Sequence, residues 1–155
     1  MKKFLVLAIV ALSFATGFCR SVDDVFNAFP EADNVQLVNM PGLLDMIQSK
    51  FDVKSKEKNG AKSIIESAKI LIIEDATDQQ KGIARQILDE GVDDLEEMVA
   101  VNDDSEDVTI LTQQQGDHVV QMLIIAFDNE GNEVGVVHLK GVLQSEDVKE
   151  MGVFN

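Results

Sequence analysis

Between residues 20 and 91 the chain alternates between apolar stripes at helical spacing and short apolar runs. Ser21 with Asp24, and Thr77 with Gln80, have the spacing of capping boxes, which predicts two helix starts. An almost continuous apolar run is typical of a strand covered on both faces. The first expected helix has Val22, Val25, Phe26 and Phe29 on one face and is ended by Pro30, and a strand follows at Val35–Asn39. A second helix, started by Asn39 and Pro41, has the apolar stripe Leu44, Ile47 and Phe51, and a Lys-rich loop follows at Lys54–Lys62. After a strand at Ala68–Ile73, a third helix buries Ile83, Ala84, Ile87 and Leu88 and stops at Gly91.

After Gly91 the pattern changes to alternation of apolar and polar residues, which is typical of strands. The links between the alternating segments are short and turn-like, so consecutive strands should pair as an antiparallel meander. Ser145 then begins a short helix that runs through Met151. The order predicts an α+β fold: a mostly antiparallel sheet, with a C-terminal four-strand meander, and helices packed on it. The four predicted strands are Glu97–Val101, Asp107–Gln113, His118–Phe127 and Glu133–Lys140.

The first nineteen residues have the pattern of a secretory signal peptide, and residues 20–155 are then a single α+β domain. Lys2 and Lys3 precede an apolar run, Phe4–Leu12, which is shorter than the roughly 20 residues that a membrane-spanning helix needs. Small residues around Gly17 favour cleavage after that residue, with cleavage after Cys19 as the alternative. We therefore expect an exported protein, periplasmic or extracellular in a Gram-negative bacterium, with no stable membrane span after cleavage.

Cys19 is the only cysteine, and it lies where the lipid-modified cysteine of a lipoprotein would lie. A lipid-modification site has a small residue before the cysteine, and Phe18 at that position disfavours this alternative. The domain that follows contains no cysteine, so it has neither an internal disulfide nor thiol chemistry.

The charge of the chain excludes some partners. Thirteen basic and 28 acidic residues give a net charge of −15, and removal of Lys2 and Lys3 makes the mature chain more acidic still. Nucleic-acid binding is driven by basic side chains that displace counterions, so we expect no nucleic-acid partner. Trp and Tyr are absent, which disfavours sugar binding by aromatic stacking.

Several segments resemble one family across nearly the whole mature chain: Ser21–Phe26, Val38–Leu44 with Met46, Ile70–Ile73, Glu97–Val101 and Leu139–Leu143. The chain resembles the domain of unknown function 4252 (DUF4252), a family of small exported proteins of Gram-negative bacteria. The resemblance implies an exported α+β domain with no assigned biochemical activity. Some relatives look like lipoproteins, which keeps the alternative at Cys19 open.

We expect no enzyme activity, no cofactor and no catalytic or metal-binding residue. If residues 129–131 form the turn of the last hairpin, His138 lies opposite Met122 and more than about 10 Å from His118, too far apart to share one metal ion. The acidic segments Asp128–Glu133 and Asn102–Asp107 lack the calcium-binding pattern of an EF-hand and are typical of turns. Nucleophile elbows, phosphate loops and dinucleotide-binding glycine patterns are absent.

The last predicted hairpin is apolar on both faces, although one face of an antiparallel sheet commonly meets water. A second apolar face needs a lid, for which the N-terminal helix or Ile64-Ile65 is the first expectation, or else a dimer or partner surface. We therefore expect a non-catalytic module that binds a protein partner or itself. A carrier of a small apolar ligand or lipid is the alternative, and a hydrolase with a carboxylate pair a further one. The candidate interaction face comprises Val120, Met122, Ile124, Val134, Val136 and His138.

Overall fold

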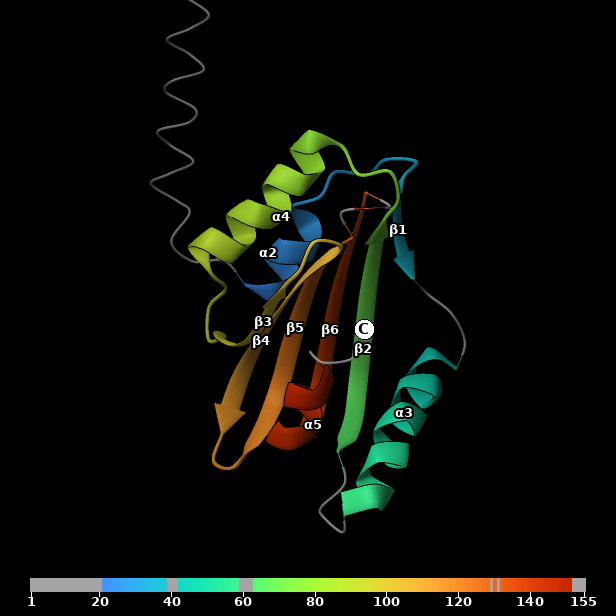
Figure 1. The fold of residues 1–155 in the computed structure, drawn as a ribbon, viewed down its shortest axis with the longest axis vertical. Helices are drawn as coiled ribbons and strands as arrows, with labels where there is room; N and C mark the ends of the chain where they lie inside the picture. The colour runs from blue at the N-terminus through green and yellow to red at the C-terminus, as the bar shows by residue number, and fades with distance from the viewer. Residues whose placement is uncertain (1–20, 39–41, 59–62, 129, 131, 152–155) are drawn as a thin grey trace, which may run out of the picture.

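The computed structural model describes residues 21–38, 42–58, 63–128, 130 and 132–151. The predicted signal peptide and Cys19 therefore lie outside the described residues, as do Asn39 and Pro41. The elements follow the predicted order (Figure 1). They are α2 (Val22–Asn27), β1 (Val35–Val38), α3 (Leu43–Lys58), β2 (Ile64–Ile73), α4 (Asp78–Glu90), β3 (Glu96–Asn102), β4 (Glu106–Gln115), β5 (His118–Asp128), β6 (Glu133–Gln144) and α5 (Ser145–Met151).

The six strands form one antiparallel sheet in the order β1-β2-β6-β5-β4-β3. The predicted α+β class and the C-terminal meander from β3 to β6 are confirmed. β2 lies between β6 and β1, so the short strand β1 forms one edge of the sheet and β3 forms the other.

Both predicted capping boxes are present. The Ser21 hydroxyl accepts from the Asp24 N–H at 3.2 Å, and the Asp24 carboxylate accepts from the Ser21 N–H at 3.0 Å. Thr77 and Gln80 make the same reciprocal pair at the start of α4, at 3.1 and 2.9 Å. Gly91 ends α4 with φ of 81°, a conformation that glycine adopts without steric cost. The starts of these two helices are therefore fixed by local sequence.

Two apolar clusters lie on opposite faces of the sheet, and helices contribute to both. α2 and α4 pack on one face, which we call the α2 face, and α3 and α5 contact the cluster on the other (Figure 1). The first expectation for the apolar hairpin, that the protein covers both faces itself, is confirmed, and α2 is one of its lids. The α2-face cluster contains Val25, Phe26, Phe29, Leu71, Ile73, Ala84, Ile87, Leu111, Leu123, Ile125, Phe127, Val134 and Val136. The opposite cluster contains Ile65, Val108, Ile110, Val119, Met122, Leu139, Leu143 and Val148.

The register of the last hairpin differs from the prediction by one residue. Asp128 pairs with Glu133, so four residues rather than three separate the strands, and His138 lies opposite Leu123 instead of Met122. A one-residue shift moves every side chain of a strand to the other face. The expectation that the six candidate residues share one face is therefore wrong. Val134 and Val136 belong to the α2-face cluster, and His138 lies on the same face of the sheet. Met122 and Ile124 belong to the opposite cluster, and Val120 lies at a bulge.

Helix α3 is longer than predicted. It continues to Lys58, so residues 54–58 of the expected loop are helical, and residues 59–62 lie outside the description. Lys, Ser and Glu are compatible with a helix, and no glycine or proline interrupts the chain before Gly60. Leu43, not Leu44, is the buried residue of the first turn, and Leu44 is exposed.

Polar side chains attach α3 and α5 to the start of β2. Gln48 donates to the Ser63 carbonyl at 2.8 Å and accepts from the Ile65 N–H at 2.7 Å, so its amide substitutes for a neighbouring strand. The buried Ser63 hydroxyl donates to the buried carboxylate of Asp147 at 2.6 Å and accepts from the Gln144 N–H at 2.9 Å. β1 does not extend to this end of β2, and the Gln48 amide instead pairs the backbone carbonyl of Ser63 and the backbone N–H of Ile65. Among the helices described, none is long and apolar enough to cross a membrane.

Candidate functional site

A groove lies between α2, the segment that follows it and the strands β1 and β2. Pro30 is part of the segment that leads from the end of α2 to the sheet edge, leaving a hollow of about 780 Å³ that is open to solvent. We call it the α2–β1 groove. It is lined by Phe26, Asn27, Phe29, Pro30, Glu31, Ala32, Asp33, Val35, Leu37, Lys69 and Leu71.

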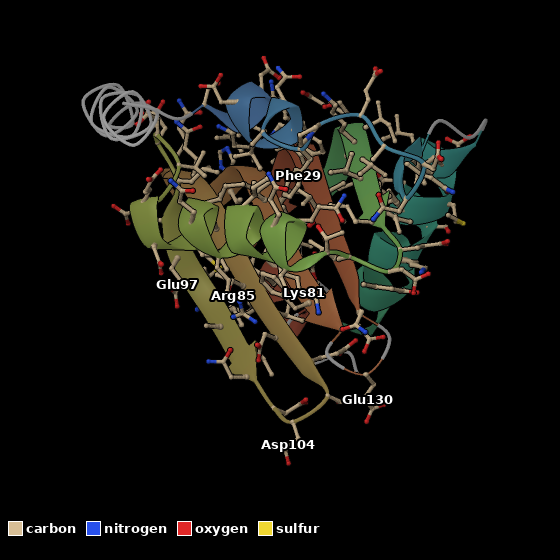
Figure 2. All side chains as sticks on the ribbon, turned by 90° about the horizontal axis from the view of Figure 1, so that it is seen from above. Phe29, Lys81, Arg85, Glu97, Asp104 and Glu130 are labelled. Carbon is tan, nitrogen blue, oxygen red and sulfur yellow. The ribbon has the colours of Figure 1, made fainter. Side chains whose placement is uncertain are left out.

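Apolar side chains form much of the groove. Phe26, Phe29 and Leu71 are buried members of the core cluster, whereas Leu37 on β1 is 55% exposed. Phe29, labelled in Figure 2, follows α2. The carboxylates of Glu31 and Asp33 are exposed beside this apolar surface. The groove therefore offers an apolar surface with polar groups around it, as sites for polypeptide segments do.

The outer edge of β1 borders the same groove. The Asn34 carbonyl accepts from the Glu74 N–H at 3.0 Å, which makes these two opposing residues a hydrogen-bonded pair. Bonded and non-bonded pairs alternate along an antiparallel ladder, so the backbone N–H and C=O of Leu37 point away from β2. β1 has no other strand partner in the described part of the sheet. Its outer edge can therefore accept a further strand.

The α2 face of the sheet changes from apolar to polar over two successive rows. The first row, from β2 to β4, is Lys69, His138, Leu123 and Leu111. The next row is polar throughout, and we call it the polar row; it comprises Ser67, Lys140, Gln121 and Gln113. Lys69 thus joins the groove to the polar row.

His138 is buried at this boundary and is held by the polar row. Its Nε2 lies 2.9 Å from Gln121 Oε1, and Gln121 Nε2 donates to Gln113 Oε1 at 2.7 Å. Because an amide oxygen only accepts, Nε2 of His138 is the donor. Burial, reinforced by the charges of Lys140 and Lys69, lowers the pKa of His138 to about 4, while Asp23 acts in the opposite direction. The imidazole is therefore neutral near pH 7.

The two positive charges near His138 lie on the same face. Lys69 and His138 are directly opposite across β2 and β6, and Lys140 is two residues from His138 on β6. The Lys69 ammonium is 4.6 Å from the centroid of the Phe26 ring, which places it over that aromatic face. No carboxylate in the described residues forms an ion pair with either lysine.

A second hollow of about 590 Å³ lies beside the opposite sheet edge. Its lining includes the carboxylates of Asp94, Glu96 and Glu97, with Lys149 from α5. It is predominantly polar, so we do not take it as the leading candidate.

The two histidines are far apart in the sheet. His118 lies opposite Gln144, six residues from His138 along β6, which corresponds to about 20 Å of strand. The described residues contain no group of three or more potential metal ligands. The expected separation of the histidines is confirmed, although the predicted opposing residue was wrong.

The acid-rich segments form turns whose carboxylates accept backbone hydrogen bonds. Asp103 Oδ1 accepts from the Ser105 N–H and hydroxyl and from the Glu106 N–H, and these bonds lower the pKa of Asp103. Asp128 Oδ1 accepts from the Glu130 N–H at 3.0 Å. Figure 2 shows Asp104 and Glu130 at the tips of the two turns, directed away from the helices.

The sequence prediction missed both the groove and the two lysines. One signal was present: Lys69 interrupts the apolar residues of β2, which the prediction treated as covered on both faces. The groove brings α2 and β1 together with Lys69 and Leu71 of β2, which lie more than thirty positions after β1, so no local pattern reveals it.

Comparisons with known proteins give one match. The family model described as domain of unknown function (DUF4252) matches residues 26–151, which is most of the chain and nearly all of the folded part. Neither the curated proteins nor the solved structures contain a significant match. The match confirms the resemblance seen in the sequence, and this chain belongs to the DUF4252 family.

Proposed function

We propose that the mature chain is an exported, non-catalytic domain that binds a protein partner through the α2–β1 groove. The observation that carries the proposal is the combination of a partly apolar groove with the outward-facing backbone of Leu37 at the sheet edge. An extended segment that adds to such an edge gains main-chain hydrogen bonds, and its alternate side chains enter the neighbouring groove.

Export is part of the proposal and rests on the N-terminal sequence. Lys2, Lys3 and the apolar run Phe4–Leu12 precede small residues, as in a cleaved signal peptide. N-terminal analysis of the protein recovered from the periplasm would distinguish cleavage after Gly17 from cleavage after Cys19. A lipid-modified Cys19 would instead place the domain on a membrane surface.

The other two hypotheses have less support. A carrier of a small apolar ligand requires a largely enclosed chamber, whereas both hollows described above are open and partly polar. A hydrolase with a carboxylate pair requires two carboxylates that converge in a site shielded from water, whereas Asp94, Glu96 and Glu97 line an open hollow. Self-association through the β1 edge is an outcome that the following experiment detects.

In-cell photo-crosslinking tests the proposal. A photo-reactive amino acid is placed at Leu37 in the full chain, which carries a tag after Asn155, and at Met46 as the control. Met46 is also an exposed apolar residue, 45% exposed, but it lies on α3. We expect one dominant envelope protein crosslinked at Leu37 and not at Met46. Ala32→Trp, which places a large side chain on the exposed lining of the groove, should abolish that crosslink without unfolding the domain.

Four outcomes would contradict the proposal. Uncrosslinked monomer at both positions would indicate that the groove is unoccupied in cells. Equal crosslinking at Leu37 and Met46 would indicate nonspecific contact. A crosslink at Leu37 that persists in Ala32→Trp would place the contact outside the groove, and a self-crosslinked dimer would replace a foreign partner with a second copy of this chain.

A further inference from the structure

The chemistry next to the groove suggests which side chains its occupant carries. Lys69 lines the groove, and Lys140 belongs to the polar row that continues from it. Adjacent strands are about 4.8 Å apart and residues along a strand rise about 3.3 Å, so the two Cα atoms, on neighbouring strands and two residues apart, are about 8 Å from each other. Both side chains project from the α2 face, and a single carboxylate between their flexible ends can contact both ammonium groups.

Charges of both signs surround the groove: Lys69 and Lys140 lie at its β2 side, and the exposed carboxylates of Glu31 and Asp33 line the segment after α2. The charges of both lysines lower the pKa of the neighbouring His138, against the opposing influence of Asp23 on α2. Charges beyond about 8 Å are largely screened at physiological ionic strength. A carboxylate between Lys69 and Lys140 is therefore attracted despite the net charge of −15, whereas Glu31 and Asp33 disfavour acidic residues elsewhere in the occupant.

The polar atoms around the lysines are already partly used within the protein. Gln121 and Gln113 bond to each other, and Gln121 also accepts a hydrogen bond from His138. Ser67 is exposed opposite Lys140 and adds a hydroxyl donor. What this surface offers to a partner is thus two ammonium groups and a hydroxyl, a combination that recognises an anion.

We propose that the polypeptide bound in the α2–β1 groove presents a carboxylate side chain, Asp or Glu, to Lys69 and Lys140. This inference rests on the proposed function, because it specifies the chemistry of the same occupant. A polypeptide's own anionic side chains are carboxylates, and its apolar side chains contact the accessible apolar lining, chiefly Leu37 with Val35. The partner segment is therefore extended, and apolar and acidic residues alternate with residues of the opposite face, so that both kinds of side chain face the α2 side of the sheet.

Two synthetic peptides test the inference with the mature protein purified after export from cells that produce the full chain. The first is acetyl-Thr-Val-Thr-Glu-Thr-Glu-amide, whose Val and Glu side chains share one face of the extended chain, and the second replaces both Glu residues by Gln. Binding is followed by amide chemical shifts of Leu37 and Lys69. At low salt we expect the acidic peptide to bind about 3- to 10-fold more tightly, the effect of one or two exposed ion pairs. The preference should decrease at high salt, because exposed ion pairs are screened.

Matched variants assign the preference to these two lysines. Lys69→Gln combined with Lys140→Gln should make the two peptides equal in affinity. Lys50→Gln combined with Lys149→Gln removes the same charge from exposed positions on α3 and α5 and should leave the preference intact.

The possible failures are distinguishable. Equal affinity of the wild-type protein for both peptides, with shifts at Leu37, would overturn the carboxylate inference and leave the groove as a polypeptide site. A preference that survives in the double variant of Lys69 and Lys140 would overturn it as well. Absence of shifts at Leu37 and Lys69 with either peptide would overturn both the inference and the proposed function.

Discussion

Gly141 occupies a position in the sheet where a side chain does not fit. It lies opposite Ile65, where β2 shifts register between Ile65 and Ser67, and its φ is 156°. A Cβ atom at this position would overlap the carbonyl oxygen of Ile64 and would lie 3.0 Å from the Ile64 carbonyl carbon and 3.1 Å from the Glu66 nitrogen. All three atoms belong to the backbone, so no side-chain rotation can relieve the overlap.

Gly141→Ala should therefore destabilise the protein. Overpacking of a well-packed site costs about 1–3 kcal/mol, and relief here requires movement of the β2 backbone, so we expect about 2–3 kcal/mol. Total stabilities of domains are about 5–15 kcal/mol, so this loss is a substantial fraction. For a domain of this size it corresponds to a decrease of roughly 8–12 °C in Tm.

Urea unfolding followed by circular dichroism provides the measurement, with Gly135→Ala as the control. Gly135 is on the same strand, and a Cβ there would meet no atom within 4 Å. Its substitution should change the free energy of unfolding by no more than about 0.5 kcal/mol, or raise it slightly, because alanine restricts the unfolded chain. Equal unfolding midpoints for the two variants would refute the close approach of β2 and β6 at the bulge.

Three further variants test other contacts. Gln48→Ala should cost about 1–2 kcal/mol, because it leaves the Ser63 carbonyl and the Ile65 N–H unpaired, whereas Ser49→Ala, which loses only a bond within α3, should cost less. Thr77→Ala should cost about 1 kcal/mol in thermal unfolding through loss of the α4 cap. Because the pKa of His138 falls from 6.5 to about 4 on folding, the unfolded chain binds an extra proton between these values, and stability should fall by up to about 2 kcal/mol as pH decreases from 6.5 to 4. His138→Gln should flatten that slope, with His118→Gln as the control; an unchanged slope would contradict the burial of the imidazole.

Local sequence was sufficient to predict the elements of the fold. The capping boxes at Ser21 and Thr77 involve residues three positions apart, so their partners are visible in the sequence. The strand pattern after Gly91 follows from alternation alone, and short links restrict neighbouring strands to antiparallel pairing. These features require no knowledge of distant contacts.

Contacts between residues far apart in the sequence account for the differences between the predicted and the observed structure. The β5–β6 register depends on a turn of four residues instead of three, and the composition of that turn permits both lengths. Burial of Leu43 rather than Leu44 depends on how α3 lies against β2. The pairing of Lys69 with His138 joins residues almost seventy positions apart, which no periodicity reveals.

The residues proposed for binding differ from those that form the core under α2 and α4. On the α2 face, apolar residues end at the row that contains Leu123, and the next row is polar. Val134 and Val136 belonged to the interaction face predicted from the sequence, but they are buried under helices, so a partner could reach them only if the protein unfolded locally. Lys140 is exposed, and the half-buried Lys69 lies over Phe26 at the margin of α2, so a partner can contact both without rearrangement of the core. Substitution of these lysines should therefore alter binding while leaving the unfolding midpoint nearly unchanged, as expected of a surface built for recognition rather than for folding.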